Sequence, residues 1–156
     1  MADQELHTIG WRERVNLPQW GLVGVRAKID TGARTSAIDV ATIEHLDGDR
    51  IRFEVVAQVN PKRVTRWVEA TPVRTTQVKS SNGLAQERIV CQTRIKIGPV
   101  EQDIELSLVC RQGMLCRMLI GRIALENTFL VNPAEKYLLT SATRPAKPIQ
   151  PLKDTP

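Results

Sequence analysis

The chain has 156 residues, a formal net charge of +5 and 42% hydrophobic residues. This length and composition predict one domain with a hydrophobic core and argue against a disordered or membrane-spanning chain. The basic excess is mild and compatible with an anionic substrate or partner. Because the sequence has no Lys/Arg block and no stripe of aromatic and basic residues, a nucleic acid is not the expected partner.

Cysteine and histidine usage excludes several kinds of site. Three cysteines without a CxxC spacing argue against a disulfide scaffold and a zinc knuckle. With only His7 and His45, no HExxH and no Gly-rich phosphate loop, we expect no metal and no cofactor. The polar N-terminus lacks the apolar segment of a signal peptide, which predicts a cytoplasmic protein.

In chain order, residues 1–8 are expected to be a flexible lead-in. Alternating or apolar runs between turn signals then predict strands. The expected strands are residues 9–17, 23–29, 36–40, 51–59, 64–70, 73–79, 87–97, 100–109, 115–120, 129–131 and 137–139. Residues 41–46 remain unassigned, and a short helix is expected over 122–126. This pattern predicts an all-β, closed barrel with one short C-terminal helix over residues 9–140, followed by a Pro-rich disordered tail, 141–156.

The turn Asp30-Thr31-Gly32-Ala33 follows the expected strand 23–29. A carboxylate that a strand delivers into such a turn is how aspartic peptidases present their catalytic acid. The alternative is an Asp that stabilises its own turn by bonding to the backbone. The apolar segment Met118-Leu-Ile-Gly-Arg122 and the Asn-Gly hairpin signal in Ser80-Ser-Asn-Gly83 favour the catalytic interpretation.

These segments together resemble the retropepsins, the half-size aspartic peptidases. More closely, the chain resembles a bacterial retropepsin-like family long labelled "ATP-dependent zinc protease". The stretches that carry the resemblance span most of residues 9–139 and are Gly10-Trp-Arg-Glu13, Leu17-Pro18, Ala27-Lys-Ile-Asp-Thr-Gly-Ala-Arg-Thr-Ser-Ala37, Ser80-Ser-Asn-Gly83, Glu87-Arg88 and Met118-Leu-Ile-Gly-Arg-Ile-Ala-Leu125. The resemblance implies a barrel of the retropepsin (acid protease) type.

The resemblance also implies roles for individual residues. Asp30, Thr31 and Gly32 would be catalytic, and Ile120, Gly121 and Arg122 would support the turn from behind. The hairpin of residues 73–90 would close over substrate as a flap, although it could equally be a plain surface hairpin. Substrate-binding positions would be Ala33, Arg34, Lys79, Ser81, Asn82, Gly83 and Arg88.

An aspartic peptidase needs two carboxylates that share one proton, and the chain has one such Asp. The hypothesis therefore requires a homodimer in which each subunit contributes Asp30. Other carboxylates that could complete a pair within one chain are Asp39, Glu69, Glu87 and Asp103, but no pattern places them next to Asp30.

Members of this family accompany enzymes that ligate glutamate to proteins, which implies acidic or glutamate-tailed substrates. The nearby cations Lys28, Arg34, Arg74, Lys79 and Arg88 fit such substrates, or are solvated charges that protect strand edges. Where the family often has His two residues after its Ser-Ala pair, this chain has Asp39. Two alternatives stay open: a catalytically inactive module for peptide binding or dimerisation, and a basic ribosome- or RNA-associated protein.

Overall fold

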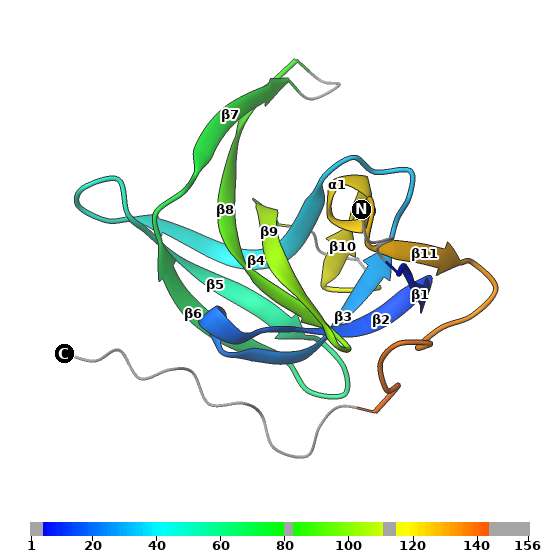
Figure 1. Ribbon diagram of the computed structural model, residues 1–156. Helices are drawn as coiled ribbons and strands as arrows, with labels where there is room; N and C mark the ends of the chain where they lie inside the picture. Colours follow the sequence, from blue (N-terminus) through cyan, green and yellow to red (C-terminus); the bar gives the residue numbers. More distant parts are fainter. Residues whose placement is uncertain (1–4, 80–82, 111–114, 144–156) are drawn as a thin grey trace.

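The computed structural model describes residues 5–79, 83–110 and 115–143 (Figure 1). In this part of the chain the elements are almost entirely strands, with one short α-helix. They are β1 (His7–Gly10), β2 (Arg12–Leu17), the 3-10 turn η1 (Pro18–Trp20), β3 (Leu22–Ile29), β4 (Ser36–His45), β5 (Ile51–Gln58), β6 (Val64–Ala70), β7 (Arg74–Lys79), β8 (Ala85–Ile97), β9 (Val100–Val109), β10 (Met118–Ile120), α1 (Arg122–Leu125) and β11 (Phe129–Asn132).

Six of these strands close into a barrel. The order β10-β3-β2-β8-β9-β4 returns to its start because β10 pairs with both β3 and β4. Met118 lies opposite Ala27 in the parallel pairing and opposite Ile38 in the antiparallel one. Strands β5 and β6 extend the sheet from β4, and β7 pairs with β8 alone. The predicted all-β closed barrel with one short helix is confirmed.

The core follows the alternation of the strands. Inward residues of β2, β3, β5 and β8 are almost fully buried, and the Trp20 and Phe53 rings meet edge to face at 5.2 Å. Cys91 and Cys116 are buried free thiols, while Cys110 is exposed. Burial raises the pKa of Cys91 to about 11, so this side chain stays a neutral thiol at physiological pH.

The expected strand 9–17 is two strands, which corrects the prediction. The strand is interrupted at Trp11, whose backbone N–H donates to the carbonyl oxygen of Glu135 at 2.9 Å. Before the break, β1 leaves the barrel and pairs in parallel with β11, His7 lying opposite Phe129. The expected lead-in therefore overlaps an ordered strand at its last two residues.

Residues 137–139 are not a strand, because a buried carboxylate holds them in an irregular path. Glu13 is fully buried, and its Oε2 accepts the N–H of Leu138 at 3.0 Å and of Gly10 at 2.7 Å. Its Oε1 accepts both the N–H and the hydroxyl of Thr140, at 3.0 and 2.6 Å. These bonds replace a β-ladder and fasten the C-terminal segment onto β2.

Other boundaries differ by a few residues. The unassigned residues 41–46 continue β4 as far as His45, where they pair with β5. The expected strand 115–120 is regular only over β10. Of the expected tail, residues 141–143 lie against the barrel through the Ala142 carbonyl oxygen, which accepts the Nε–H of Arg14 at 2.9 Å; residues 144–156 lie outside the described residues.

In the described chain, no helix has the length and apolar character needed to cross a membrane.

Candidate active site

Asp30 follows β3 and is held in a tight turn. Its N–H donates to the carbonyl oxygen of Ile120 at 2.9 Å, which continues the β3–β10 pairing by one residue. Its Oδ1 accepts the N–H of Gly32 at 2.9 Å, and its carbonyl oxygen accepts the N–H of Ala33 at 3.2 Å. The carboxylate is half-buried in a turn whose next two residues are exposed. The turn therefore orients one carboxyl oxygen and leaves the side chain accessible at the surface.

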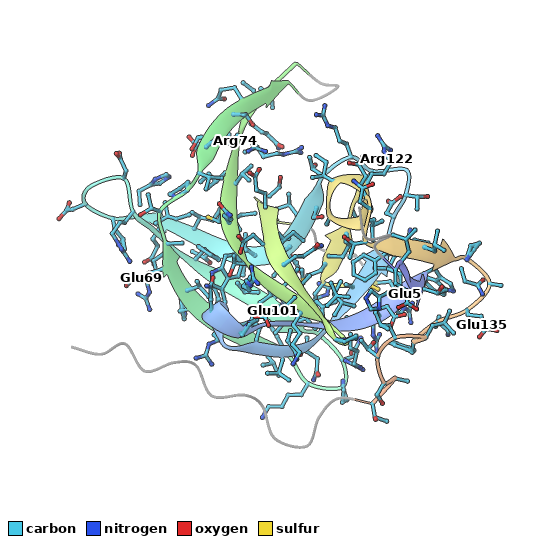
Figure 2. All side chains as sticks on the ribbon, viewed as in Figure 1. Glu5, Glu69, Arg74, Glu101, Arg122 and Glu135 are labelled. Atoms are coloured by element: carbon cyan, nitrogen blue, oxygen red, sulfur yellow. The ribbon has the colours of Figure 1, made fainter. Side chains whose placement is uncertain are left out.

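The segment after β10 supports this turn from behind. The Arg122 guanidinium donates to the carbonyl oxygens of Thr31 and Gly32 at 3.0 and 3.1 Å. The backbone N–H of Arg122 donates to the carbonyl oxygen of Ala33 at 2.8 Å. Thr31 joins these contacts through its carbonyl oxygen. Figure 2 shows Arg122 beside the loop between β3 and β4.

Gly121 has no room for a side chain. Its N–H donates to the buried Ser36 Oγ at 3.0 Å, and a Cβ would lie 2.4 Å from the carbonyl oxygen of Thr35 and 2.9 Å from that of Ala33. These neighbours are backbone atoms that other contacts hold in place. Because φ of Gly121 is −95°, the requirement for glycine is steric.

We expect Gly121→Ala to destabilise the fold by about 2–4 kcal/mol and to shift the Asp30 turn, because the backbone must move to admit a methyl group. Urea unfolding and peptidase assays measure the two effects. Gly48→Ala is the comparison: its Cβ would meet no atom within 4 Å, so only its positive φ of 71° is strained, at about 1–2 kcal/mol. A Gly121→Ala protein as stable as the parent would show that the turn is not tightly packed.

The predicted flap is a real hairpin of β7 and β8, in register from Arg74 opposite Val90 to Lys79 opposite Ala85. Figure 1 shows it rising from the barrel at the same end as the loop between β3 and β4. Gly83 and Arg88 are exposed on its returning strand, whereas Ser81 and Asn82 lie outside the described residues. The proposed binding residues thus fall into two groups, with Ala33 and Arg34 in the Asp30 loop and the others in the hairpin.

A cavity of about 340 Å³ lies between the base of the hairpin and α1. Thr35 and Ser36 contribute its wall next to the Asp30 loop, Ile123 contributes the α1 side, and Arg74 contributes the hairpin side. Arg74 also forms an ion pair with Glu105 of β9. Of these residues the sequence had singled out Arg74, as a cation that fits an acidic substrate, and Thr35 and Ser36 belong to the stretch around Asp30 that carries the resemblance.

Each of the four alternative carboxylates lies next to an Arg or His side chain. Asp39 forms a buried pair with Arg117 at 2.5 Å, with 7% and 9% of the two side chains exposed. At the surface, the other pairs are Glu69 with Arg50 at 3.5 Å, Glu87 with His45 at 3.7 Å and Asp103 with Arg94 at 3.1 Å. The buried pair gives Asp39 a structural role at the position where members of the family that the sequence resembles often have His. The described residues hold no group of three or more His, Cys, Asp or Glu side chains placed to bind a metal ion.

The closed barrel, the Asp-Thr-Gly turn and the β10 support define a retropepsin-like protein. A family model described as RimB-like, "Retropepsin-like aspartic endopeptidase RimB", matches residues 8–142. The chain belongs to this RimB-like family. A Legionella pneumophila protein of unknown function, Lpg0085 (DUF785), has a similar fold, with a TM-score of 0.70 and 23% identity over 86% of this chain and 99% of that one.

Curated relatives carry a different name. Proteins from Shewanella pealeana and Desulfotalea psychrophila, each named "Probable alpha-L-glutamate ligase", are 34% and 33% identical to this chain over 142 and 143 residues. The matches cover 89% and 87% of this chain but only 31% and 30% of those proteins. The chain therefore spans about a third of the length of these relatives, and their name describes proteins with much additional sequence.

Proposed function

We propose that this protein is an aspartic peptidase whose catalytic pair forms between two copies of the chain. The observation that carries the proposal is Asp30 itself, an accessible carboxylate oriented by the N–H of Gly32 and anchored through its own N–H to Ile120. The membership of the RimB-like family supports this chemistry. The four other candidate carboxylates each lie next to an Arg or His side chain, which favours a partner for Asp30 from a second subunit.

The mechanism follows from the electrostatics of two close carboxyl groups. Two such groups a few ångströms apart cannot both ionise, so the pair keeps one proton. The ionised Asp30 would take a proton from a water molecule as that water attacks the scissile carbonyl carbon. The protonated Asp30 of the other subunit would donate its proton to the carbonyl oxygen, and the pair would titrate as a unit. The hairpin β7–β8 would close over the bound peptide and exclude bulk water.

For the substrate we propose an acidic protein segment, including glutamate tails. The cations Arg34, Arg88 and Arg122 lie on the loop, the hairpin and the start of α1, and all three are exposed. The name of the relatives supports this choice, because an enzyme that adds glutamate and one that cleaves an acidic tail share a substrate class. The proposal therefore has two partners for this chain: a second copy of the chain and an acidic protein substrate.

Dilution tests the dimer. Sedimentation equilibrium should show a monomer–dimer equilibrium, and specific activity on glutamate-rich peptides should fall in proportion to the dimer fraction as the protein is diluted. A linked tandem dimer, with two copies joined by a flexible linker, is the control and should keep its specific activity on dilution. A strict monomer that cleaves peptides with undiminished specific activity would contradict the shared pair, and a dimer inactive on all peptides would favour a binding module.

A further inference from the structure

A row of residues on the outer face of the barrel leads from the Asp30 strand to the cavity between the hairpin and α1. The members of the row lie opposite one another in successive strand pairings, in the order Lys28 (β3), Leu119 (β10), Ala37 (β4), Ser107 (β9) and Val90 (β8). Lys28 precedes Asp30 by two residues, and the pairing with β10 continues through the Asp30 N–H, so both side chains project from the same face. The last two members of the row line the cavity.

The spacing of the strands gives the length of this row. Neighbouring strands lie about 4.8 Å apart, so the steps from β3 through β10 and β4 to Ser107 of β9 add up to about 14 Å. An extended peptide advances about 3.4 Å per residue, and about four residues therefore span the same distance. A peptide whose scissile bond lies at Asp30 thus reaches the cavity with a side chain about four residues away.

The cavity offers an aliphatic surface next to α1. Its aliphatic lining residues are Val90, Ile104, Ile123 and Ala124. Ile123 is 57% exposed, whereas Val90 and Ile104 are buried and Ala124 is half-buried. An apolar ligand in the cavity would remove the surface of Ile123 from water, which is favourable.

The charges around the cavity disfavour a carboxylate in it. Arg74 already pairs with Glu105, and Asp103 pairs with Arg94 at 3.1 Å. The charged residues of the described lining are thus two acids, Asp103 and Glu105, and one cation, Arg74. An acidic side chain would meet this negative excess, whereas an aliphatic side chain would cover Ile123 and break no ion pair.

We propose that this cavity binds an aliphatic side chain of the substrate, such as Leu, about four residues from the scissile bond. The inference rests on the proposed peptidase function and narrows its substrate to an acidic segment that contains or borders on an aliphatic residue. Arg34, Arg88 and Arg122 attract the acidic part, and Ile123 selects the aliphatic residue. In the proposed dimer each subunit supplies one such cavity, so the Leu can lie on either side of the scissile bond.

The test is a set of glutamate-rich peptides of about twelve residues, long enough to span the row on both sides of the scissile bond. A single Leu is moved through the sequence, and mass spectrometry locates the cleaved bond. Cleavage should occur about four residues from the Leu, and kcat/KM should exceed that of the same peptides with Asp in place of Leu by about tenfold. Equal kcat/KM for Leu and Asp peptides, or a cleaved bond that does not move with the Leu, would overturn the proposal.

Ile123→Ser is the variant that tests the assignment. Leu130→Ser is the matched control, because Leu130 is 55% exposed on β11 and lies outside the described lining of the cavity. Ile123→Ser should raise KM for the Leu peptides about fivefold or more with little change in kcat, and should leave the Asp peptides unaffected. Leu130→Ser should change neither. If Ile123→Ser fails to fold, Ile123→Ala replaces it and should raise KM in the same direction. An unchanged KM in the Ile123 variant would contradict the assignment.

A binding measurement separates this inference from the peptidase proposal. In ¹H–¹³C spectra of Asp30→Asn protein, which leaves the peptide intact, a Leu peptide should shift the methyl resonances of Ile123 and Ala124, and an Asp peptide should leave them in place. Such shifts, without cleavage of any peptide by the parent, would support the cavity site and contradict the peptidase function. Cleavage by the parent without these shifts would support the peptidase function and overturn the cavity site.

Discussion

Replacing Asp30 with Asn is expected to reduce peptide cleavage on the order of 1,000-fold, because the amide can neither take a proton from water nor donate one to the scissile carbonyl. The fold should remain intact, since the Asn Oδ1 can still accept the N–H of Gly32 as the Asp oxygen does. Initial rates on glutamate-rich peptides, measured from acid to neutral pH, check this expectation. Full activity of Asp30→Asn would exclude the aspartic mechanism.

Asp47→Asn is the matched control, because it removes the same charge from an exposed turn between β4 and β5 and should leave cleavage unchanged. A mixing experiment extends the test to the partner subunit. An equal amount of Asp30→Asn protein, added to a fixed amount of parent protein, should lower activity to about half, since half of the parent subunits then pair with a variant subunit. No effect of the added variant would show that one subunit suffices.

Replacing Glu13 with Gln is expected to destabilise the protein by about 3–5 kcal/mol, because an amide NH₂ would face N–H donors that now meet a buried carboxylate. Both carboxyl oxygens are engaged: Oε2 by Gly10, Leu138 and Leu139, and Oε1 by Thr140. Residues 137–140 should detach from β2, and Leu139 should lose its close packing against the turn at Gly98.

Urea unfolding measures this loss, and limited proteolysis should show earlier cleavage in the C-terminal segment. Glu69→Gln removes an exposed carboxylate that pairs with Arg50 at 3.5 Å, and it should cost less than about 1 kcal/mol. Similar costs for Glu13→Gln and Glu69→Gln would mean that the buried carboxylate does not hold the segment.

The sequence predicted most strands because each strand's alternation records which of its faces is buried. Ile51, Phe53 and Val55 alternate in the sequence and are all buried in β5. The break at Trp11 was missed because it depends on a hydrogen bond to Glu135, far along the chain. The hydrogen bonds that join Glu13 to residues 138–140 were missed for a similar reason. Glu13 lies between Arg12 and Arg14 in a polar run, which a local pattern assigns to the surface.

The sequence by itself determined the all-β class, the β7–β8 hairpin and the turn that presents Asp30, because these depend on local periodicity and turn chemistry. Only the tertiary structure decided how the barrel closes, since β10 joins β3 and β4 by pairings that lie some eighty to ninety residues apart in the chain. Tertiary structure also decided which polar side chains lie together: Asp39 pairs with Arg117, Glu13 accepts hydrogen bonds from Thr140, and Arg14 lies opposite Arg26. Partners of this kind are set by chain folding over long separations, which no local pattern of residues encodes.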